Sequence, residues 1–270
     1  MVCLCLKNKG SAVRFCLWPR MYKKISSLIY VFQIIVFGKD NWLRKILLNK
    51  RSLQNFSSLD VNEDFYYSFK SIRNTPFNGD KIRADIVNKI LISKSPKKII
   101  ETGTWVGNTT DFFSNFKSEV YSIESNSSFY ALSLLRFSKK ENVTIIKGSS
   151  HDVITKFDNF KENIFVYLDA HWEEFVPLDF ELNHLKNFTD VIVLIDDFKV
   201  EQIPDWKYDK YNNIELSHEY FSVLNNFDLF FPNYKPTDLK NHSGFVIASR
   251  GSESKRILSG IKEITFYEKS

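Results

Sequence analysis

From about residue 80 onward, apolar runs of strand length alternate with segments whose apolar residues recur at helical spacing. Ile82, Ile86 and Ile90 share one face of a helix expected over residues 79–91. The strands expected after it are residues 97–104, 119–125, 142–150, 163–170 and 190–198. The helices expected between them are residues 108–117, 127–140, 151–160 and 177–188. Strands joined by helices pair in parallel, so the pattern predicts an α/β, doubly wound, Rossmann-like parallel sheet with helices on both faces.

The last third of the chain changes character. Two further apolar segments, residues 228–234 and 244–250, are separated by polar sequence that contains proline. No helix-length apolar pattern separates them, so they are expected to pair antiparallel at one edge of the sheet near the C-terminus.

The N-terminal part of the chain differs in composition from the rest. Residues 26–38 are the most apolar stretch, shorter than the roughly 20 residues that span a bilayer, and basic residues flank them. This suits an interfacial helix on anionic lipid, with residues 20–51 in peripheral membrane contact, and equally a helix packed against its own domain or a partner. We therefore expect a basic, partly apolar arm over residues 1–51 and one folded domain over residues 52–270.

Charge and cysteine content separate the same two parts. Residues 1–51 contain 11 Lys and Arg and one acid, a net charge of +10, and the remaining 26 basic and 31 acidic residues give −5. A mildly acidic folded domain argues against a duplex nucleic-acid partner. All three cysteines lie in the arm, so the folded domain needs no disulfide. A cytoplasmic protein, peripheral at the membrane through its arm, is the expected localisation.

The first strand of the predicted sheet ends in a glycine-containing turn. Gly103 and Gly107 lie in the sequence ETGTWVGNTT, with Glu101 just before them and a helix expected from Asn108. Glycines there allow a ligand to approach the backbone, and a helix N-terminus offers unpaired N–H groups. Glu124 ends the second strand, 21 residues after Gly103, at the distance of a ribose-binding acid in dinucleotide-type folds. These residues predict a nucleoside-containing cofactor.

The pattern E-x-G-x-x-x-G resembles motif I of class I S-adenosylmethionine (SAM) dependent methyltransferases. The resemblance implies that Gly103 and Gly107 flank the methionine part of SAM, that Glu124 holds the ribose hydroxyls, and that residues 149–151 lie by the adenine. The full set implied for the cofactor is Glu101, Gly103, Thr104, Gly107, Asn108, Thr109, Glu124, Ser149, Ser150 and His151.

Carboxylates follow the fourth and fifth strands of the predicted sheet. Asp169 ends VYLD, with His171 two residues on, and Asp196 and Asp197 end VLIDD. Parallel strands place their carboxyl ends at one edge, and neither motif puts a basic residue between the acids, so three acids packed there repel one another. A divalent cation removes the conflict, and oxygen ligands suit Mg²⁺. Asp169, Asp196 and Asp197 are therefore the predicted metal ligands, and His171 is the predicted base.

The blocks GSSHDVI, VYLDAHW and VLIDDF resemble those of metal-dependent O-methyltransferases, both the catechol type and the macrocin-type sugar enzymes. The resemblance covers about residues 79 to 250. It implies that the three aspartates bind the metal and that Asp169 and His171 are catalytic. Glu173 and Glu174 stand where the catechol type has a lysine, and Ala170 separates the acid from the histidine, so the base assignment departs from the family pattern.

These patterns predict a SAM-dependent O-methyltransferase, Mg²⁺-assisted, acting on a hydroxyl of a saccharide or other small metabolite. The aromatic segment 199–211 is expected to form the acceptor wall. Three alternatives remain open: a metal-independent methyltransferase that uses Asp169 as a simple base, an NAD(P)-dependent reductase, and a non-catalytic SAM-fold binding module. Dependence on Mg²⁺ and the identity of the cofactor separate these readings.

Overall fold

The computed structural model describes residues 2–8, 11–17, 75–157, 162–171, 176–211 and 213–268, and the chain forms two compact units, Met1–Ser71 and Ile72–Ser270. In the first unit, β1 (Val2–Asn8) and β2 (Ser11–Leu17) pair antiparallel. The expected domain boundary at residue 51 and the expected membrane contact of residues 20–51 lie outside the described residues. Among the described helices, none has the length and apolarity needed to cross a membrane.

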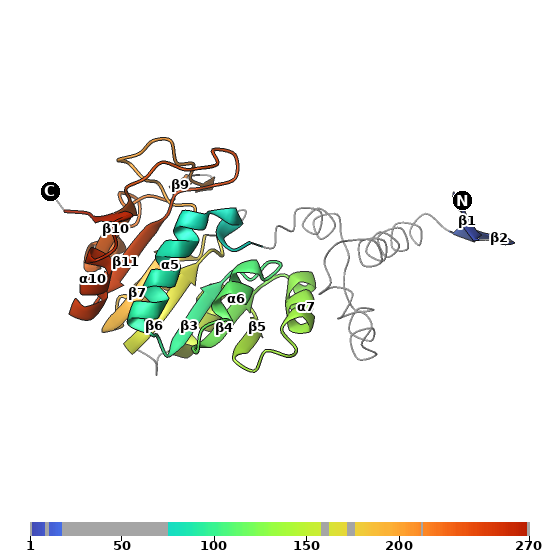
Figure 1. The fold of residues 1–270 in the computed structure, drawn as a ribbon, viewed down its shortest axis with the longest axis horizontal. Helices are drawn as coiled ribbons and strands as arrows, with labels where there is room; N and C mark the ends of the chain where they lie inside the picture. The colour runs from blue at the N-terminus through green and yellow to red at the C-terminus, as the bar shows by residue number, and fades with distance from the viewer. Residues whose placement is uncertain are drawn as a thin grey trace. The chain divides into compact units, whose positions relative to one another are not determined.

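The second unit is built on an eight-stranded sheet in the order β12-β10-β11-β7-β6-β3-β4-β5 (Figure 1). Its strands are β3 (Lys98–Thr102), β4 (Glu119–Glu124), β5 (Val143–Lys147), β6 (Glu162–Leu168), β7 (Asp190–Ile195), β10 (Asp228–Pro232), β11 (Val246–Arg250) and β12 (Ile264–Phe266). The strands from β7 to β5 are parallel, and β11, β10 and β12 continue the sheet antiparallel. The predicted parallel sheet with an antiparallel edge pair is confirmed.

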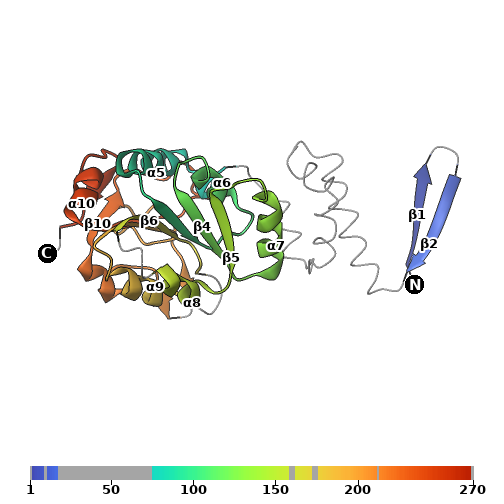
Figure 2. The same ribbon diagram turned by 90° about the horizontal axis from the view of Figure 1, so that it is seen from below.

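Helices cover both faces of this sheet (Figure 2). The helical segments are η1 (Phe77–Gly79), α5 (Lys81–Lys94), α6 (Asn108–Phe113), α7 (Ser127–Arg136), α8 (Ser150–Ile154), η2 (Thr155–Phe157), α9 (Leu178–Leu185), η3 (Ser222–Asn226) and α10 (Ser252–Ser259). Helices α5, α6 and α10 lie on one face and α8 and α9 on the other. A small hairpin, β8 (Lys210–Tyr211) with β9 (Ile214–Glu215), lies apart from the sheet.

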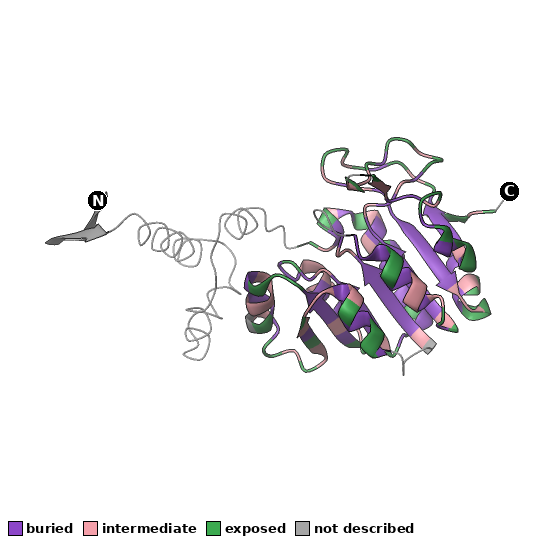
Figure 3. Cartoon of the chain, turned by 180° about the vertical axis from the view of Figure 1, so that it is seen from behind, coloured by how far each residue is buried: buried purple, intermediate pink, exposed green. Residues whose placement is uncertain are grey.

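Two apolar cores follow from the alternation of side chains along each strand. Ile99 of β3 packs into the core beneath α5, whereas its neighbour Ile100 packs into the core beneath α9. Because both faces are covered, the central strands are buried throughout, while the outer faces of the helices are exposed (Figure 3). This explains why the strands appear in the sequence as continuous apolar runs rather than as an alternating pattern.

The connectivity defines a single switch point in the sheet. From the central β3 the chain continues to β4 and β5 on one side, and then returns to β6 and β7 on the other. In open α/β sheets a ligand binds beyond the carboxyl ends of the strands at such a point. A ligand site is therefore expected at the turns that follow β3 and β6.

Helix α5 is tied to this end of the sheet by a buried ion pair. Asp80 caps the helix by accepting the N–H groups of Ile82 and Arg83, both at 3.1 Å. The Arg83 guanidinium reaches Asp196, just after β7, and also donates to the Ser243 carbonyl. Burial lowers the pKa of Arg83, but Asp196 and Asp80 outweigh that effect and raise it. Arg83 is therefore charged and forms ion pairs with both Asp196 and Asp80.

Replacing Arg83 tests this arrangement. Arg83→Met leaves Asp196 as a buried charge without its cationic partner, so the free energy of unfolding should fall by about 3–5 kcal/mol. The control is Arg256→Met, which removes an exposed ion pair with Glu253 and should change it by less than about 1 kcal/mol. Urea denaturation followed by circular dichroism measures both. Equal losses in the two variants would contradict the role given to Arg83.

Candidate functional site

The turn after β3 packs against the turn after β6. Gly103 has a φ of 84° and Gly107 a φ of 80°, values that favour glycine, and Trp105 between them has a φ of 47°. A Cβ placed on Gly103 would lie 2.2 Å from the carbonyl oxygen of Asp169. The backbones of Gly103 and Asp169 can approach this closely because Gly103 has no side chain. The predicted cofactor turn and the predicted acidic motif are therefore in direct contact.

Glu101 lies beneath the cofactor turn as a buried carboxylate, 1% exposed. It accepts hydrogen bonds from the hydroxyls of Thr110 and Ser122. Burial raises the pKa of Glu101 to about 7, although the two hydroxyls oppose the shift by stabilising the charged form. Glu101 therefore changes its charge near neutral pH in the folded protein.

Glu124, at the end of β4, is held against the same turn. Its carboxylate accepts the backbone N–H of Trp105 at 2.8 Å and that of Asn126 at 2.7 Å. Burial raises the pKa of Glu124, and these backbone donors partly offset the shift. The predicted ribose acid therefore lies next to the predicted cofactor turn, as its spacing from Gly103 suggested.

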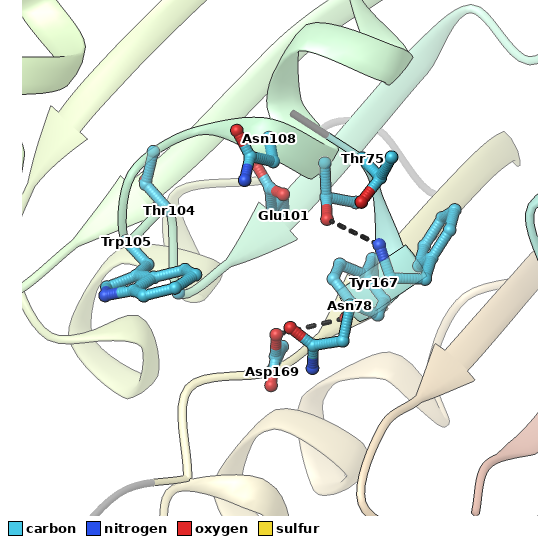
Figure 4. Close-up of a pocket in the computed structure, with 11 residues that line it drawn as sticks. Thr75, Asn78, Glu101, Thr104, Trp105, Asn108, Tyr167 and Asp169 are labelled. Carbon is cyan, nitrogen blue, oxygen red and sulfur yellow. Dashed lines mark hydrogen bonds between the residues drawn. The ribbon is translucent and has the colours of Figure 1, made fainter. Parts of the chain in front are cut away.

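A pocket opens between the cofactor turn and the segment that precedes α5 (Figure 4). Its lining residues are Thr75, Phe77, Asn78, Glu101, Gly103, Thr104, Trp105, Asn108, Thr109, Tyr167 and Asp169. The lining includes five predicted cofactor residues and the predicted catalytic acid. None of these described lining residues is a lysine or an arginine.

Five lining residues were not among the predicted site residues, and one of them, Trp105, lies within the predicted cofactor turn. Thr75, Phe77 and Asn78 precede α5, and Tyr167 comes from within β6. Phe77 and Asn78 have positive φ values of 51° and 53°. The only signal in the sequence was the Asn78-Gly79 pair, which marks a turn but not a pocket.

The remaining predicted cofactor residues lie outside this pocket lining. Gly107 begins α6, and a Cβ there would lie 2.7 Å from the Phe137 ring. Ser149 shares a hydrogen bond of 2.8 Å with His151, and Ser150 between them is buried at the start of α8. These three residues follow β5, at the opposite edge of the parallel strands from β7. Their predicted contact with adenine stays a prediction.

Asp196 is enclosed by protein donors. Arg83 and the backbone N–H of Asp197, the latter at 2.9 Å, donate to one of its oxygens, and the Tyr167 hydroxyl donates to the other. Neither motif contains a basic residue, but Arg83 reaches Asp196 from a helix far away in the sequence. Asp196 therefore belongs to an ion pair and lies outside the group of possible metal ligands formed by Asp169, His171 and Asp197, so its predicted role as a ligand stays a prediction.

The other two acids converge with the histidine. One ligand atom from each of Asp169, His171 and Asp197 lies within 4.8 Å of the others, the one such group of His, Cys, Asp and Glu among the described residues. The pKa of Asp169 is raised well above its ordinary value, first by burial and then by the charges of Asp196 and Asp197. The Tyr167 hydroxyl, 3.0 Å from Asp169, opposes that shift.

His171 and Asp197 form a pair within this cluster. The ring nitrogen Nε2 of His171 lies 3.6 Å from a carboxylate oxygen of Asp197. Burial lowers the pKa of His171, but Asp197 outweighs burial and raises it, and the same contact lowers the pKa of Asp197. Asp197 has a φ of 52°, a strained value for a residue other than glycine. The strain places its carboxylate beside the ring.

The donor set fits a divalent cation. Asp169 and Asp197 offer carboxylate oxygens, and the Arg83 charge is taken up by Asp196 and Asp80. Magnesium is commonly held by one or two carboxylates, with waters and substrate completing the octahedron. Two of the three predicted ligands therefore suit Mg²⁺ at this site.

One aromatic residue of the predicted acceptor wall reaches the cluster. The Tyr211 hydroxyl lies 2.8 Å from the backbone carbonyl oxygen of His171 and 2.5 Å from a carboxylate oxygen of Asp209. Trp206 instead is buried in the core, where its Nε1 donates to the Tyr234 carbonyl. Tyr208 donates to Glu215 at 2.6 Å. Tyr211 is therefore the member of segment 199–211 that is placed to meet an acceptor.

No protein-family model matches the chain, and no curated protein matches it either. Among solved structures, it is similar to an O-methyltransferase from Bacillus cereus in complex with SAH, with 13% identity, a TM-score of 0.49, and coverage of 82% of this chain and 95% of that one. It is similar to the O-methyltransferase TomG from Streptomyces achromogenes in complex with SAM, with 14% identity, a TM-score of 0.47, and coverage of 62% and 80%. It is also similar to CalS10, an amino pentose methyltransferase from Micromonospora echinaspora, with 10% identity, a TM-score of 0.46, and coverage of 70% of this chain and 95% of that one. Likenesses this distant do not decide function.

The close contact at Gly103 can be tested by adding one methyl group. Gly103→Ala should lower the free energy of unfolding by at least about 2 kcal/mol, because the Cβ meets the Asp169 backbone and φ is positive. The control is Gly260→Ala, where φ is −84° and the nearest atom would be 3.4 Å away, and it should change stability by less than about 1 kcal/mol. Thermal and urea unfolding measure both. An alanine at 103 with unchanged stability would show that the two turns do not touch.

The raised pKa of Glu101 predicts a pH-dependent effect of Glu101→Gln. The folded state favours the protonated carboxyl, so the stability that this group contributes is present below pH 4.5 and is lost as the pH rises through about 7. Glutamine cannot ionise, so the variant should gain about 3 kcal/mol relative to wild type between pH 4.5 and pH 8. Urea denaturation across that range measures the difference. A difference that stays constant with pH would contradict the shift.

Proposed function

We propose that this protein is a SAM-dependent O-methyltransferase that methylates a hydroxyl of a saccharide or other small metabolite with the help of Mg²⁺. The contact of Gly103 with the Asp169 backbone is the observation that carries the proposal. Through this contact the cofactor turn lies next to Asp169, which belongs to the Asp169–His171–Asp197 cluster. A methyl donor in the pocket would therefore have its acceptor beside it.

The charge of the pocket favours SAM over a nicotinamide dinucleotide. SAM carries a positive sulfonium and an ammonium group, whereas a dinucleotide carries an anionic pyrophosphate. The described lining contains the acids Glu101 and Asp169 and no basic residue, and a bound cation would favour the charged forms of both acids, whose pKa values burial raises. Glu124 lies beside the same turn, where each of its oxygens accepts one backbone N–H and keeps a further lone pair for a ribose hydroxyl. These groups support a cationic, ribose-containing cofactor.

When bound, SAM supplies a methyl group on sulfur that is open to attack by a nucleophile. The hydroxyl oxygen of the acceptor forms the new C–O bond as the C–S bond breaks, and the sulfur keeps the electron pair. His171 accepts the proton that the hydroxyl releases, and Asp197, at 3.6 Å, stabilises the resulting imidazolium. The Tyr211 hydroxyl lies within hydrogen-bond distance of both the His171 backbone carbonyl and Asp209. His171 and Asp197 thus act together as the base.

Asp169 and Asp197 would hold Mg²⁺ when it is bound. A bound cation lowers the pKa of a coordinated hydroxyl and fixes the direction from which that hydroxyl attacks. Asp196 does not take part, because Arg83 and Tyr167 occupy its oxygens. Its role is to keep Arg83 away from the two acids that bind the metal.

The aromatic residues at the site suit a saccharide acceptor. Trp105 lines the pocket and is 37% exposed, so part of its ring is open to a bound ligand. Tyr211 lies across the cluster, with its ring 6.3 Å from that of His171. Sugar rings pack their C–H faces against such side chains while their hydroxyls reach polar groups. This supports a saccharide as the first acceptor class to try.

The test is turnover of SAM to S-adenosylhomocysteine by the full chain with a panel of nucleotide sugars and oligosaccharides. Asp169→Asn should lower turnover at least about 100-fold while the affinity for S-adenosylhomocysteine changes less than about 3-fold. EDTA should also abolish turnover, and Mg²⁺ should restore it. Asp85→Asn, at an exposed position on α5, is the matched control. Normal turnover by Asp169→Asn would refute the role of the cluster, and full turnover in EDTA would favour a metal-independent enzyme.

A further inference from the structure

The second half of the cofactor turn packs against the end of helix α7. Gly107 is not among the residues that line the pocket, and a Cβ placed on it would lie 2.7 Å from the ring of Phe137 and 3.5 Å from the Arg136 side chain. Phe137 directly follows α7 and is buried. Gly107 also has a φ of 80°, which a residue with a side chain rarely adopts. The contact with the end of α7 therefore explains this glycine.

Arg136, the last residue of α7, reaches the cofactor turn with its guanidinium. Its Nη1 donates to the backbone carbonyl of Val106 at 2.5 Å and to the side-chain oxygen of Asn108 at 2.9 Å. Its Nη2 lies 3.7 Å from a carboxylate oxygen of Asp111, in the first turn of α6. The Arg136 side chain is 9% exposed. One largely buried cation therefore contacts the turn, the first residue of α6 and an acid of that helix.

These contacts bear on two residues that line the pocket, Trp105 and Asn108 (Figure 4). The hydrogen bond from Arg136 fixes the amide of Asn108, because the amide oxygen must face the guanidinium. Val106 is fully buried, so its carbonyl needs a donor from within the protein. The carbonyl of Trp105, whose φ of 47° is strained, lies 3.4 Å from the hydroxyl of Ser133 on α7. Helix α7 therefore supplies donors to two successive carbonyls of the turn.

Packing alone does not require an arginine at the end of α7. A methionine would also cover the ring of Phe137, whose centre lies 5.6 Å from the Arg136 guanidinium. It would leave the buried Val106 carbonyl without this charged donor, and a buried polar group that loses its partner is costly. Arg136 is not among the residues that line the pocket. Any effect of Arg136 on a ligand therefore passes through the turn.

We propose that Arg136 is the positioning residue of the cofactor turn. It holds Val106 and Asn108 against α7, so that Trp105 and the start of α6 keep the shape that accepts the cofactor before the cofactor binds. A turn that is already ordered loses less conformational entropy on binding, which raises affinity. The proposal rests on the proposed function only in naming SAM as the ligand of the turn. The contacts of Arg136 with the turn do not depend on which cofactor binds.

Calorimetric titration of the full chain with S-adenosylhomocysteine is the first test. Arg136→Met should weaken binding about 10-fold or more, because the charge-assisted hydrogen bonds that order the turn are lost. The matched control is Arg256→Met, which removes an arginine from the last turn of α10 and should bind as wild type does. The titrations are made at a temperature at which circular dichroism shows each variant to be folded. Binding by Arg136→Met as tight as that of wild type would overturn the proposal.

Amide hydrogen exchange, followed by NMR, gives a second readout that needs no cofactor. The Trp105 N–H donates to Glu124, and the Gly107 N–H donates to a carbonyl within the turn, both at 2.8 Å. Arg136→Met should speed exchange at these two amides about 10-fold or more, because the turn opens locally once α7 no longer holds it. Exchange at Val193, buried in β7, should stay as in wild type.

The outcomes separate a positioning role from a structural one. Faster exchange in Arg136→Met at Val193 as well as in the turn would mean a general loss of stability and would overturn the proposal, and so would unchanged exchange at Trp105 and Gly107. Arg136→Gln keeps a neutral donor, and it replaces Arg136→Met in both experiments, with changes in the same direction, should that variant not fold. If wild type does not bind S-adenosylhomocysteine, the proposed function fails, whereas exchange in the turn still decides the role of Arg136.

Discussion

The buried ion pair between Arg83 and Asp196 determines which of the acids at the carboxyl ends of β6 and β7 are free to bind a ligand. Three acids follow β6 and β7, and without a counter-charge they would repel one another at the floor of the site. Arg83 neutralises Asp196, and the Tyr167 hydroxyl occupies its second oxygen. Asp169 and Asp197 are left beside His171, with their oxygens available to a cation or an acceptor. Because Asp196 is paired with Arg83, Asp169 and Asp197 remain without a basic partner from that helix. The Arg83–Asp196 ion pair also holds α5 against the sheet.

The second constraint is a contact between two backbones. Gly103 begins the turn after β3 and lies against the carbonyl of Asp169, which leaves no room for a side chain. Because β3 and β6 are neighbours at the switch point of the sheet, their turns meet at the place where α/β folds bind ligands. The predicted cofactor turn and the predicted acceptor side of the site therefore touch each other at Gly103 and Asp169. Under the proposed function, the methyl donor and the acceptor would bind on either side of this contact.

Local sequence patterns predicted the sheet and the two motifs, and long-range contacts explain what they missed. The apolar runs located the parallel strands and the antiparallel pair, because a strand buried on both faces must be apolar throughout. Nothing near Arg83 marks it as the partner of Asp196, which lies 113 residues away. The lining at Thr75 and Asn78 was missed because it depends on backbone conformation rather than on a motif.

The central claim is that an acid-lined pocket beside Gly103 takes a cationic, ribose-containing cofactor. Calorimetric titration of the full-length wild-type chain with S-adenosylhomocysteine, and in parallel with NAD⁺ and NADP⁺, tests it most directly. The account predicts saturable binding of S-adenosylhomocysteine at one site per chain and no heat with either dinucleotide. A folded chain that bound a nicotinamide dinucleotide, or that failed to bind S-adenosylhomocysteine, would contradict it.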